Sequence, residues 1–423
     1  MTASHPAELP TTKVLVVGGA YGGLSAAVNL LDINNHINPR FNYPNYTWDP
    51  DAPRTPIEVT LVDERDGYYH LIGSPLAFAS SSYAPHSWTR YADIPALQQP
   101  NLHILHGSVS SVDTTAKEAR IVDVVTKEER VLSYDYLIAA TGLRRPFPVQ
   151  SQAQTRKAFL LEAGEHIHSV QNATAGVVVV GGGAVGIEMA AELKHVHPEI
   201  KVTLIHSRNQ LLSNEPLCDE LKNRALELTR EMGVEVILNQ RVKETRSEVK
   251  DGVKKKEVEL EDGTKLVASE VIMALSKSVP SSSFFPASAL DEEGYVKITP
   301  RLTLQEGTPN ADFHFAAGDV ARWSGIKRCG GAMHMGYHAA INVHQSILSR
   351  ALPGREPAWL EISEFLPRIG LAVGKKAVAV TPDGPVIHGE DVMEAYFGDN
   401  LGLSTCWNYM QLSPEKLKDR LFS

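Results

Sequence analysis

The sequence predicts an α/β protein built from two similar modules in tandem, with a smaller α+β region after them. Two stretches, Lys13–Leu24 and Gly176–Leu193, each run from a short apolar strand pattern through a glycine-rich turn into a helical pattern. The first glycines of the two turns, Gly18 and Gly181, lie 163 residues apart, and short strand patterns follow each helix. A repeat of this size governs the fold, because each copy must bury its own apolar strands.

The first glycine turn predicts a phosphate site. A helix that begins there presents unpaired N–H groups and the positive end of its dipole, and both favour an anion. The dinucleotide fingerprint is G-x-G-x-x-G. Its three positions here are Gly18, Ala20 and Gly23, so alanine replaces the middle glycine. The alternative is a glycine-rich turn in an ordinary strand–helix–strand unit.

The segment Asp32–Pro56 is rich in asparagine and proline and has no periodicity, which predicts a loop. The strand Ile57–Val62 follows, with Asp63 and Glu64 at its end, where an acid would bind a ribose hydroxyl. Asp63 lies further from the first glycine than the usual spacing of about 20 residues, and the loop accounts for the excess. A solvated strand end is the alternative for Asp63.

The rest of the first copy contains several short strand patterns. Three of them predict an antiparallel meander: His103–Val112, Ala119–Val125 and Arg130–Leu132. Tyr136–Ala140 is a further buried strand, and it ends in Thr141 and Gly142.

The second copy carries the complete fingerprint, at Gly181, Gly183 and Gly186. Three patterns predict a second meander: Val234–Leu238, Glu244–Val249 and Lys255–Leu260. Val271–Leu275 is the last strand of this copy. A strand at Ala311–Val320 then ends in Gly318–Asp319, and a helix follows at Ala332–Leu348. The tail, Trp359–Ser423, reads as strands, including Ile369–Val373 and Lys376–Val380, with turns and a short closing helix.

The second strand of the second copy, Lys201–Ile205, runs into His206 and Arg208 without an acid. A carboxylate there would bind a ribose 2′-hydroxyl and repel a 2′-phosphate. Its absence, with Arg208 and His206 close by, favours NADPH or the use of both NADPH and NADH. The alternative is that Arg208 is a solvated surface residue.

Composition excludes several classes of protein. The net charge of −9 and the pI near 6.0 argue against non-specific nucleic-acid binding. No apolar stretch is long enough to span a bilayer, and the N-terminal residues lack a signal peptide, a transit peptide and the glycine needed for myristoylation. We therefore expect a cytoplasmic protein. Its three cysteines form no C-x-x-C pair, so neither a redox dithiol nor a zinc knuckle is expected.

The order of these motifs resembles the two-dinucleotide-binding-domain flavoproteins of the pyridine nucleotide–disulfide oxidoreductase superfamily, over about residues 12–348. Within it the chain looks like the apoptosis-inducing-factor-like and ferroptosis-suppressor-protein-like branch, a relative of type II NADH dehydrogenases. That likeness rests on Val202–Ser207, Gly336–Ala339 and Ser404–Met410. The resemblance implies two Rossmann-like three-layer domains. Residues 11–148 and 289–350 would bind FAD, 149–288 would bind NAD(P)H, and 351–423 would cover the flavin.

The resemblance also implies an FAD site. The first glycine turn would hold the pyrophosphate, and Asp63 the adenosine ribose. Val109 would lie beside the adenine. Asp319 would bind the ribityl chain, with a helix cap as its alternative role. Met333–Gly336 would open a helix that points at the flavin. The residues expected at FAD are Gly18, Gly19, Ala20, Gly22, Gly23, Asp63, Glu64, Val109, Thr141, Gly142, Asp319, Met333 and His334.

The residues expected at NAD(P)H are Gly181, Gly183, Ala184, Gly186, Glu188, His206 and Arg208. Glu188 would lie near the nicotinamide or would only complement the helix dipole. Glu188 and His338 are the candidate catalytic residues. His334 and His338 share one helix face, which could indicate a metal site. No third ligand lies at a suitable spacing, so the preferred interpretation is that both side chains pack against flavin or substrate. Cys329 has no partner thiol nearby in the sequence and receives no role.

The predicted function is an FAD-dependent NAD(P)H oxidoreductase without a redox-active disulfide. It passes a hydride to flavin and then electrons to a quinone-like or other small organic acceptor. The alternatives are a flavin-dependent oxidase or dehydrogenase of specialised metabolism and a redox-sensing interaction protein. Four aromatic residues would either stack on the acceptor or form the core or a dimer surface of the C-terminal domain: Tyr396, Phe397, Trp407 and Tyr409. No nucleic-acid partner is expected, and a homodimer and a peripheral membrane contact stay open.

Overall fold

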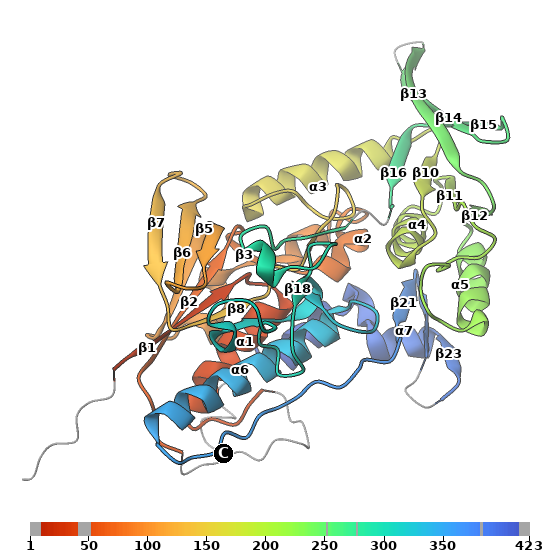
Figure 1. Ribbon diagram of the computed structural model, residues 1–423. Helices are drawn as coiled ribbons and strands as arrows, with labels where there is room; N and C mark the ends of the chain where they lie inside the picture. The colour runs from red at the N-terminus through yellow and green to blue at the C-terminus, as the bar shows by residue number, and fades with distance from the viewer. Residues whose placement is uncertain (1–9, 41–51, 251–252, 276–277, 381–383, 414–423) are drawn as a thin grey trace, which may run out of the picture.

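The computed structural model describes residues 10–40, 52–250, 253–275, 278–380 and 384–413. Part of the predicted loop, residues 41–51, and the end of the tail lie outside these ranges. Two layered modules and a smaller C-terminal α+β region are present, as the sequence predicts (Figure 1). Within the described residues, no helix has both the length and the apolar character needed to cross a membrane.

The first module is a seven-stranded sheet in the order β19-β8-β1-β2-β5-β6-β7. Its strands are β1 (Thr12–Val17), β2 (Ile57–Asp63), β5 (Leu102–Asp113), β6 (Glu118–Asp123), β7 (Glu129–Ser133), β8 (Tyr136–Ala139) and β19 (His314–Ala316). The first half of β5 pairs in parallel with β2, and its second half pairs antiparallel with β6. The predicted meander is therefore confirmed, as a direct extension of the parallel sheet.

Two long helices, α1 (Tyr21–Asn34) and α6 (Cys329–Ala351), pack against each other in this module (Figure 1). The predicted loop thus begins later than Asp32, because α1 continues to Asn34 and is buried throughout. Two further boundaries were wrong. The strand expected at Ala311–Val320 is only three residues long, since short 3₁₀ turns flank β19. The helix expected from Ala332 begins at Cys329.

The second module has a four-stranded parallel sheet in the order β12-β11-β10-β16. Its strands are β10 (Val177–Val180), β11 (Val202–Ile205), β12 (Glu235–Ile237) and β16 (Glu270–Met273), and its helices are α3 (Arg156–Gln171), α4 (Ala184–Val196) and α5 (Asp219–Glu231). The separate meander consists of β13 (Val242–Lys250), β14 (Val253–Leu260) and β15 (Lys265–Ala268).

The assignment of Val234–Leu238 to the second meander was wrong. The amphipathic helix α5 precedes this segment and returns the chain alongside β11, so β12 pairs with β11 in parallel. The third strand of the meander is β15 instead, which pairs antiparallel with β14.

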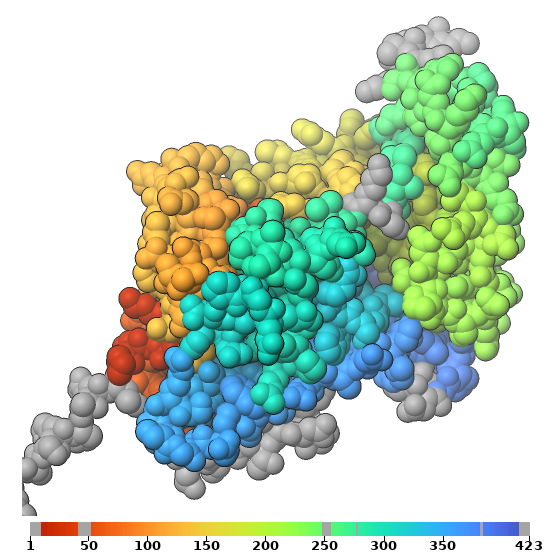
Figure 2. All heavy atoms as spheres, in the orientation of Figure 1, coloured from red at the N-terminus to blue at the C-terminus, as the bar shows by residue number. Residues whose placement is uncertain are grey.

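The C-terminal region contacts both modules. It comprises β21 (Gly370–Val373), β22 (Lys376–Val380), β23 (Val386–Gly389), α7 (Glu390–Tyr396) and α8 (Leu403–Tyr409). The strands pack on α4 and α5, whereas the end of α8 returns to the first module. There the buried Arg40 guanidinium donates to the carbonyl oxygen of Met410 (3.0 Å) and pairs with Asp32 (2.6 Å). In Figure 2 the blue chain that follows α6 runs along the lower edge of the molecule from the first module toward the second.

The remaining elements are short. They are β3 (Gly67–Tyr69), α2 (Ser74–Ala77), β4 (Trp88–Arg90), β9 (Leu143–Arg144), β17 (Val279–Pro280), β18 (Val296–Lys297) and β20 (Ala321–Arg322). β9 leaves the first module and pairs antiparallel with β17, which returns to it. The two chain crossings between the modules are therefore hydrogen-bonded to each other.

Candidate functional site

The first glycine turn joins β1 to α1. Backbone atoms leave no room for a side chain at Gly18 or at Gly23. Gly18 has a φ of +98°, and a Cβ there would lie 2.6 Å from the carbonyl oxygen of Ala140. A Cβ at Gly23 would lie 1.7 Å from the carbonyl oxygen of Gly18. Ala20, in contrast, precedes α1 with a negative φ of −98°, so no left-handed φ demands a glycine there. The backbone thus explains why alanine is accepted at the middle position of the fingerprint.

Asp63 lies at the end of β2 and closes this turn. Its carboxylate accepts hydrogen bonds from the N–H groups of Gly19 (2.5 Å) and Arg65 (2.7 Å). Burial raises the pKa of Asp63, although the nearby Arg65 opposes this shift. The Tyr91 hydroxyl donates to the carbonyl oxygen of Gly19 (2.8 Å). Glu64 points elsewhere, to an ion pair with Arg144 (2.6 Å).

The second glycine turn, between β10 and α4, has the same construction. Gly181 has a φ of +123°, and a Cβ there would lie 2.3 Å from the carbonyl oxygen of Ala274. A Cβ at Gly186 would lie 1.8 Å from the carbonyl oxygen of Gly181. Gly183 caps α4, of which Ala184 is the first residue, and a Cβ at Gly183 would meet no atom within 4 Å. Open space therefore remains at the start of this helix.

His206 takes the position in the second module that Asp63 has in the first. Its Nδ1 accepts the N–H of Gly182 (3.1 Å), so the ring proton is on Nε2 and is donated to the Ser213 hydroxyl (3.0 Å). Burial lowers the pKa of His206, and the neighbouring Arg208 lowers it further. Arg208 itself is exposed.

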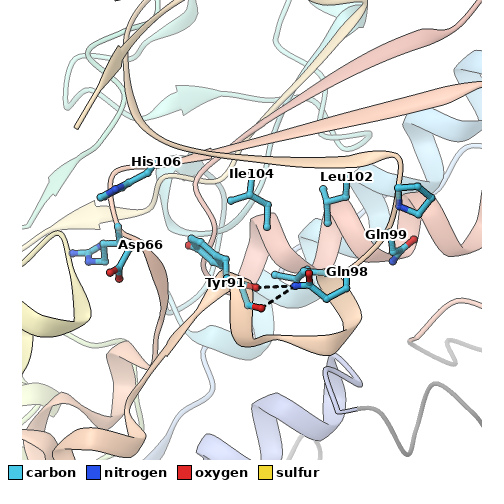
Figure 3. Close-up of a pocket in the computed structure, with 11 residues that line it drawn as sticks. Asp66, Tyr91, Gln98, Gln99, Leu102, Ile104 and His106 are labelled. Atoms are coloured by element: carbon cyan, nitrogen blue, oxygen red, sulfur yellow. Dashed lines mark hydrogen bonds between the residues drawn. The ribbon is translucent and has the colours of Figure 1, made fainter. Parts of the chain in front are cut away.

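A cavity of about 610 Å³ lies beside the end of β2. Arg65 and Asp66 stand at one end, and Figure 3 shows Leu102, Ile104 and His106 following β5 along its wall. Val109, which was expected beside a ligand, lies further along β5 in the half that pairs with β6, and it does not line this cavity. The alternation of Leu102, Ile104 and His106 is the sequence signal that marks this wall.

The first turn of α6 carries the N–H groups of Cys329, Gly330 and Gly331, because the first intrahelical bond runs from the N–H of Ala332 to Arg328. The expectation that Met333 and His334 form the helix start was therefore wrong; both lie in the second turn. The Met333 carbonyl oxygen accepts a hydrogen bond from the Ser25 hydroxyl of α1 (2.8 Å).

Two glycines allow α1 and α6 to cross closely. A Cβ at Gly336 would lie 2.1 Å from the carbonyl oxygen of Gly22, and one at Gly22 would lie 3.2 Å from that of Ala332. By contrast, a Cβ at Gly330 would meet no atom within 4 Å. The start of α6 is therefore fixed against α1 on one side and open on the other.

Asp319 precedes α6, and burial raises its pKa, while Arg145 and Lys327 oppose this shift. Its carboxylate lies 3.9 Å from the Arg145 guanidinium. Thr141 donates its hydroxyl to the carbonyl oxygen of Ser281 (2.5 Å), at the crossing between the modules. Beside it, Gly142 has a φ of +67° and open space around its α-carbon.

Glu188 extends from α4 toward the first module. Burial raises the pKa of Glu188 to about 8, the N–H of Ala372 opposes this shift, and Glu192 and Cys329 raise the pKa further. Glu192, one turn along α4, also has its pKa raised to about 8 by burial. Both carboxyl groups are mostly protonated at neutral pH. The electrostatic effect of Cys329 on Glu188 indicates that Glu188 faces the start of α6.

His334 and His338 lie with their ring centroids 4.2 Å apart. Burial lowers the pKa of His334 to about 4 and that of His338 to about 3. Arg328 lowers the pKa of His334 further, and His334 lowers that of His338. A neutral His338 is a poor proton donor at pH 7. In the described ranges, no cluster of three or more His, Cys, Asp or Glu side chains that could hold a metal includes these rings.

The fold brings together two thiols that sequence spacing could not pair. The Sγ atoms of Cys329 and Cys406 are 3.8 Å apart, and all three cysteines are free thiols. Trp407 meets Tyr68 edge to face with centroids 6.1 Å apart. The predicted aromatic group is divided: Trp407 packs against the core of the first module and Phe397 against the small core of the C-terminal region, while Tyr396 and Tyr409 are each 41% exposed.

The profile of the pyridine nucleotide-disulphide oxidoreductase family matches residues 12–336. Oxidoreductase OXR1 from Ajellomyces capsulatus is 47% identical over 408 residues, which cover 94% of this chain and 87% of that protein. Ferroptosis suppressor protein 1 from Homo sapiens is 27% identical over 417 residues, covering 96% and 98%. NDH2 from Plasmodium falciparum, solved in complex with NADH, superposes with a TM-score of 0.65 at 14% identity and covers 95% and 97%. The chain therefore belongs to the pyridine nucleotide-disulphide oxidoreductase family, as an oxidoreductase that uses FAD and NAD(P)H.

Proposed function

We propose that the protein passes a hydride from NADPH to FAD and then two electrons to a planar, quinone-like acceptor. The observation that carries this proposal is the approach of two helix starts from different modules. Glu188, at the beginning of the second turn of α4, is close enough to Cys329, the first residue of α6, for their charges to interact. Hydride transfer needs such an approach, because the reacting atoms must come within about 3–3.5 Å.

The first module fits FAD. We assign the pyrophosphate to the turn at Gly18 and the adenosine end to the cavity beside β5. The ribityl chain is assigned to Asp319, whose carboxylate accepts from hydroxyl groups. Room for the dinucleotide is left beside Gly142 and Gly330, where a Cβ would meet no protein atom within 4 Å. When bound, FAD supplies the hydride acceptor and stores two electrons.

The first turn of α6 would stabilise the flavin ring electrostatically. The N–H groups of Cys329 and Gly331 are not used within the helix, and that of Gly330 is directed at the Cys329 sulfur. They lie at the positive end of a 23-residue helix, where developing negative charge is stabilised. These three residues replace Met333 and His334 in our assignment of this part of the site.

The second module fits NADPH. His206 uses Nδ1 to hold the glycine turn, so no carboxylate at this strand end repels a 2′-phosphate. The exposed Arg208 guanidinium can bind that phosphate in a bidentate manner. We therefore propose that NADPH is preferred to NADH.

Glu188 would orient the nicotinamide as a hydrogen-bond donor. With a pKa of about 8, its carboxyl group carries a proton in most molecules at pH 7. A protonated carboxyl can donate to the amide oxygen of the nicotinamide without repelling the reduced flavin. Hydride transfer itself needs no general base, so His338 receives no proton-transfer role. The quinone-like acceptor rests on the resemblance to type II NADH dehydrogenases.

The test is spectroscopic. The purified protein should be yellow, NADPH should bleach it without oxygen, and a water-soluble quinone should restore the colour. A colourless protein that takes up no added FAD would contradict the proposal. Slow reduction with a stable charge-transfer band and no effective acceptor would instead support a redox-sensing role. A panel of acceptors tested on the NADPH-reduced protein would identify the second substrate.

A further inference from the structure

Cys329 and Cys406 form a pair of thiols at the start of α6. The two residues are 77 positions apart in the sequence, and their Sγ atoms lie 3.8 Å apart, with Cys406 donating to Cys329. Cys406 is 3% exposed. Cys329, by contrast, is partly exposed.

The two thiols differ in acidity. The hydrogen bond from Cys406 lowers the pKa of Cys329, and burial opposes this effect. A position in the first turn of a helix also favours a thiolate. The same contact with Cys329, together with burial, raises the pKa of Cys406. Cys329 is therefore the nucleophile of the pair, and Cys406 stays protonated.

The surroundings hold Cys406 next to Cys329. Just before α8, the carbonyl oxygen of Leu401 accepts a hydrogen bond from His70 Nε2 (3.0 Å). The hydroxyls of Tyr21 and Tyr68 lie 3.2 and 3.1 Å from Nδ1 of the same ring. Burial lowers the pKa of His70 to about 4, so the ring is neutral and Nδ1 is an acceptor. This network joins α8 to the first module at the point where the two sulfurs meet.

We propose that the Cys329–Cys406 pair is an oxidation site for small peroxides. The Cys329 thiolate attacks the O–O bond, takes one oxygen as a sulfenic acid and releases hydroxide, which is protonated to water. The Cys406 thiol then attacks the sulfenic sulfur, a disulfide forms, and a second water leaves. The two sulfurs lose two electrons in total, and the peroxide gains them. The product would join α8 covalently to the start of α6.

The test uses the full-length protein as purified and hydrogen peroxide as the probe. After treatment with one equivalent, free thiols are alkylated and the peptides are mapped. We expect the number of free thiols to fall from three to one, with a Cys329–Cys406 disulfide and a free Cys218, which is exposed. In Cys406→Ser, dimedone should trap a sulfenic acid on Cys329. In Cys329→Ser, Cys406 should stay reduced.

The inference is wrong if Cys218 is oxidised while the pair stays reduced, or if Cys406 is oxidised equally fast in Cys329→Ser. The Cys218→Ser variant is the matched control and should form the disulfide at the wild-type rate. Peptide mapping of the wild-type protein alone decides the question if a serine variant does not fold. The mapping does not depend on flavin, so a protein that binds no FAD would contradict the proposed function and leave this test valid.

Discussion

Asp63 and His206 occupy matching positions in the two modules, and each accepts a hydrogen bond from the glycine turn beside it. The turns need an acceptor at this position, but the two acceptors differ in charge. A carboxylate can still accept from ribose hydroxyls, whereas the imidazole uses its remaining N–H on Ser213. The strand end beside the first glycine turn thus carries an acidic residue, Asp63, and the one beside the second turn carries a neutral residue, His206. The neutral strand end is compatible with a bound phosphate.

The choice between NADPH and NADH is tested at Arg208. We expect Arg208→Ala to lower kcat/KM for NADPH by about tenfold or more, since a hydrogen bond to a charged group contributes about 1.5–3 kcal/mol. The value for NADH should stay unchanged, because NADH has no 2′-phosphate. Arg230→Ala, at an exposed position of α5, is the control. An equal loss with both nucleotides would contradict the assignment.

Glu192 makes stability depend on pH. Its folded pKa of about 8 lies above the ordinary value of 4.5, so the folded protein retains a proton that the unfolded chain loses. This stabilisation is complete below pH 4.5 and is lost as pH rises to about 8, at about 1.4 kcal/mol per pKa unit.

We expect Glu192→Gln to flatten the fall in unfolding free energy between pH 5 and pH 8, measured by urea denaturation. Glu165→Gln, on the exposed side of α3, should keep the wild-type slope. Part of the slope should remain in Glu192→Gln, because the pKa of Glu188 is also raised. Equal slopes in the wild type and in Glu192→Gln would show that Glu192 titrates normally.

Ala20 tests the placement of the pyrophosphate. The φ of Ala20 is negative and does not demand a glycine, so Ala20→Gly should leave FAD bound and stability nearly unchanged. The measurement is flavin content after purification and after dialysis. Loss of flavin in this variant would mean that the pyrophosphate lies elsewhere.

At the scale of elements, the crossing of α1 and α6 positions the first glycine turn against the start of α6. Gly336→Ala would place a methyl group 2.1 Å from the carbonyl oxygen of Gly22. We expect it to destabilise the fold by about 1–3 kcal/mol, as overpacking does, and to reduce flavin retention. Thermal unfolding and flavin content measure both effects.

Gly330→Ala is the matched comparison on the same helix. Its methyl group meets no protein atom, and alanine favours a helix by up to about 1 kcal/mol over glycine. The protein without cofactor should therefore be as stable as the wild type or more stable, while FAD should bind more weakly. Unchanged FAD affinity in this variant would place the flavin away from the first turn of α6.

Sequence patterns predicted the elements with long apolar runs and glycine turns, because these carry strong local signals. The helices α3 and α5 were missed, although their buried residues recur at helical spacing, as at Leu221, Ala225 and Leu228. The Thr155 side chain even caps α3. The three-residue strand β12 could not be assigned to a sheet, because pairing depends on the helix before it. The Cys329–Cys406 contact depends on tertiary structure alone.

At the scale of the whole molecule, the tail fastens the two modules together. Its strands pack on α4 and α5, and its last described helix is held by Arg40 and His70 of the first module. The predicted division at residues 148, 288 and 350 stays a prediction. Because the tail contacts both modules, we infer that it stabilises their association, and we call it the clamp.

The clamp is tested at the buried ion pair of Arg40 with Asp32. Arg40→Met would leave a buried carboxylate without its cation, which costs about 3–5 kcal/mol. We expect a lower unfolding free energy and faster proteolysis within residues 352–369, which have no regular structure. Arg54→Met, at an exposed position, should change stability by less than about 0.5 kcal/mol. Equal stability of the two variants would show that Arg40 does not hold the tail.

The strand order of the first sheet has a consequence for synthesis. β8 ends at Ala139, but its neighbour β19 begins only at His314, after the whole second module. The second module is continuous in the chain, so it can fold on the ribosome while the first sheet still lacks an edge strand. Pairing over such a distance in sequence is slow. We therefore expect flavin to be incorporated late, after the second module has formed. A chain whose synthesis stops before His314 should contain no flavin.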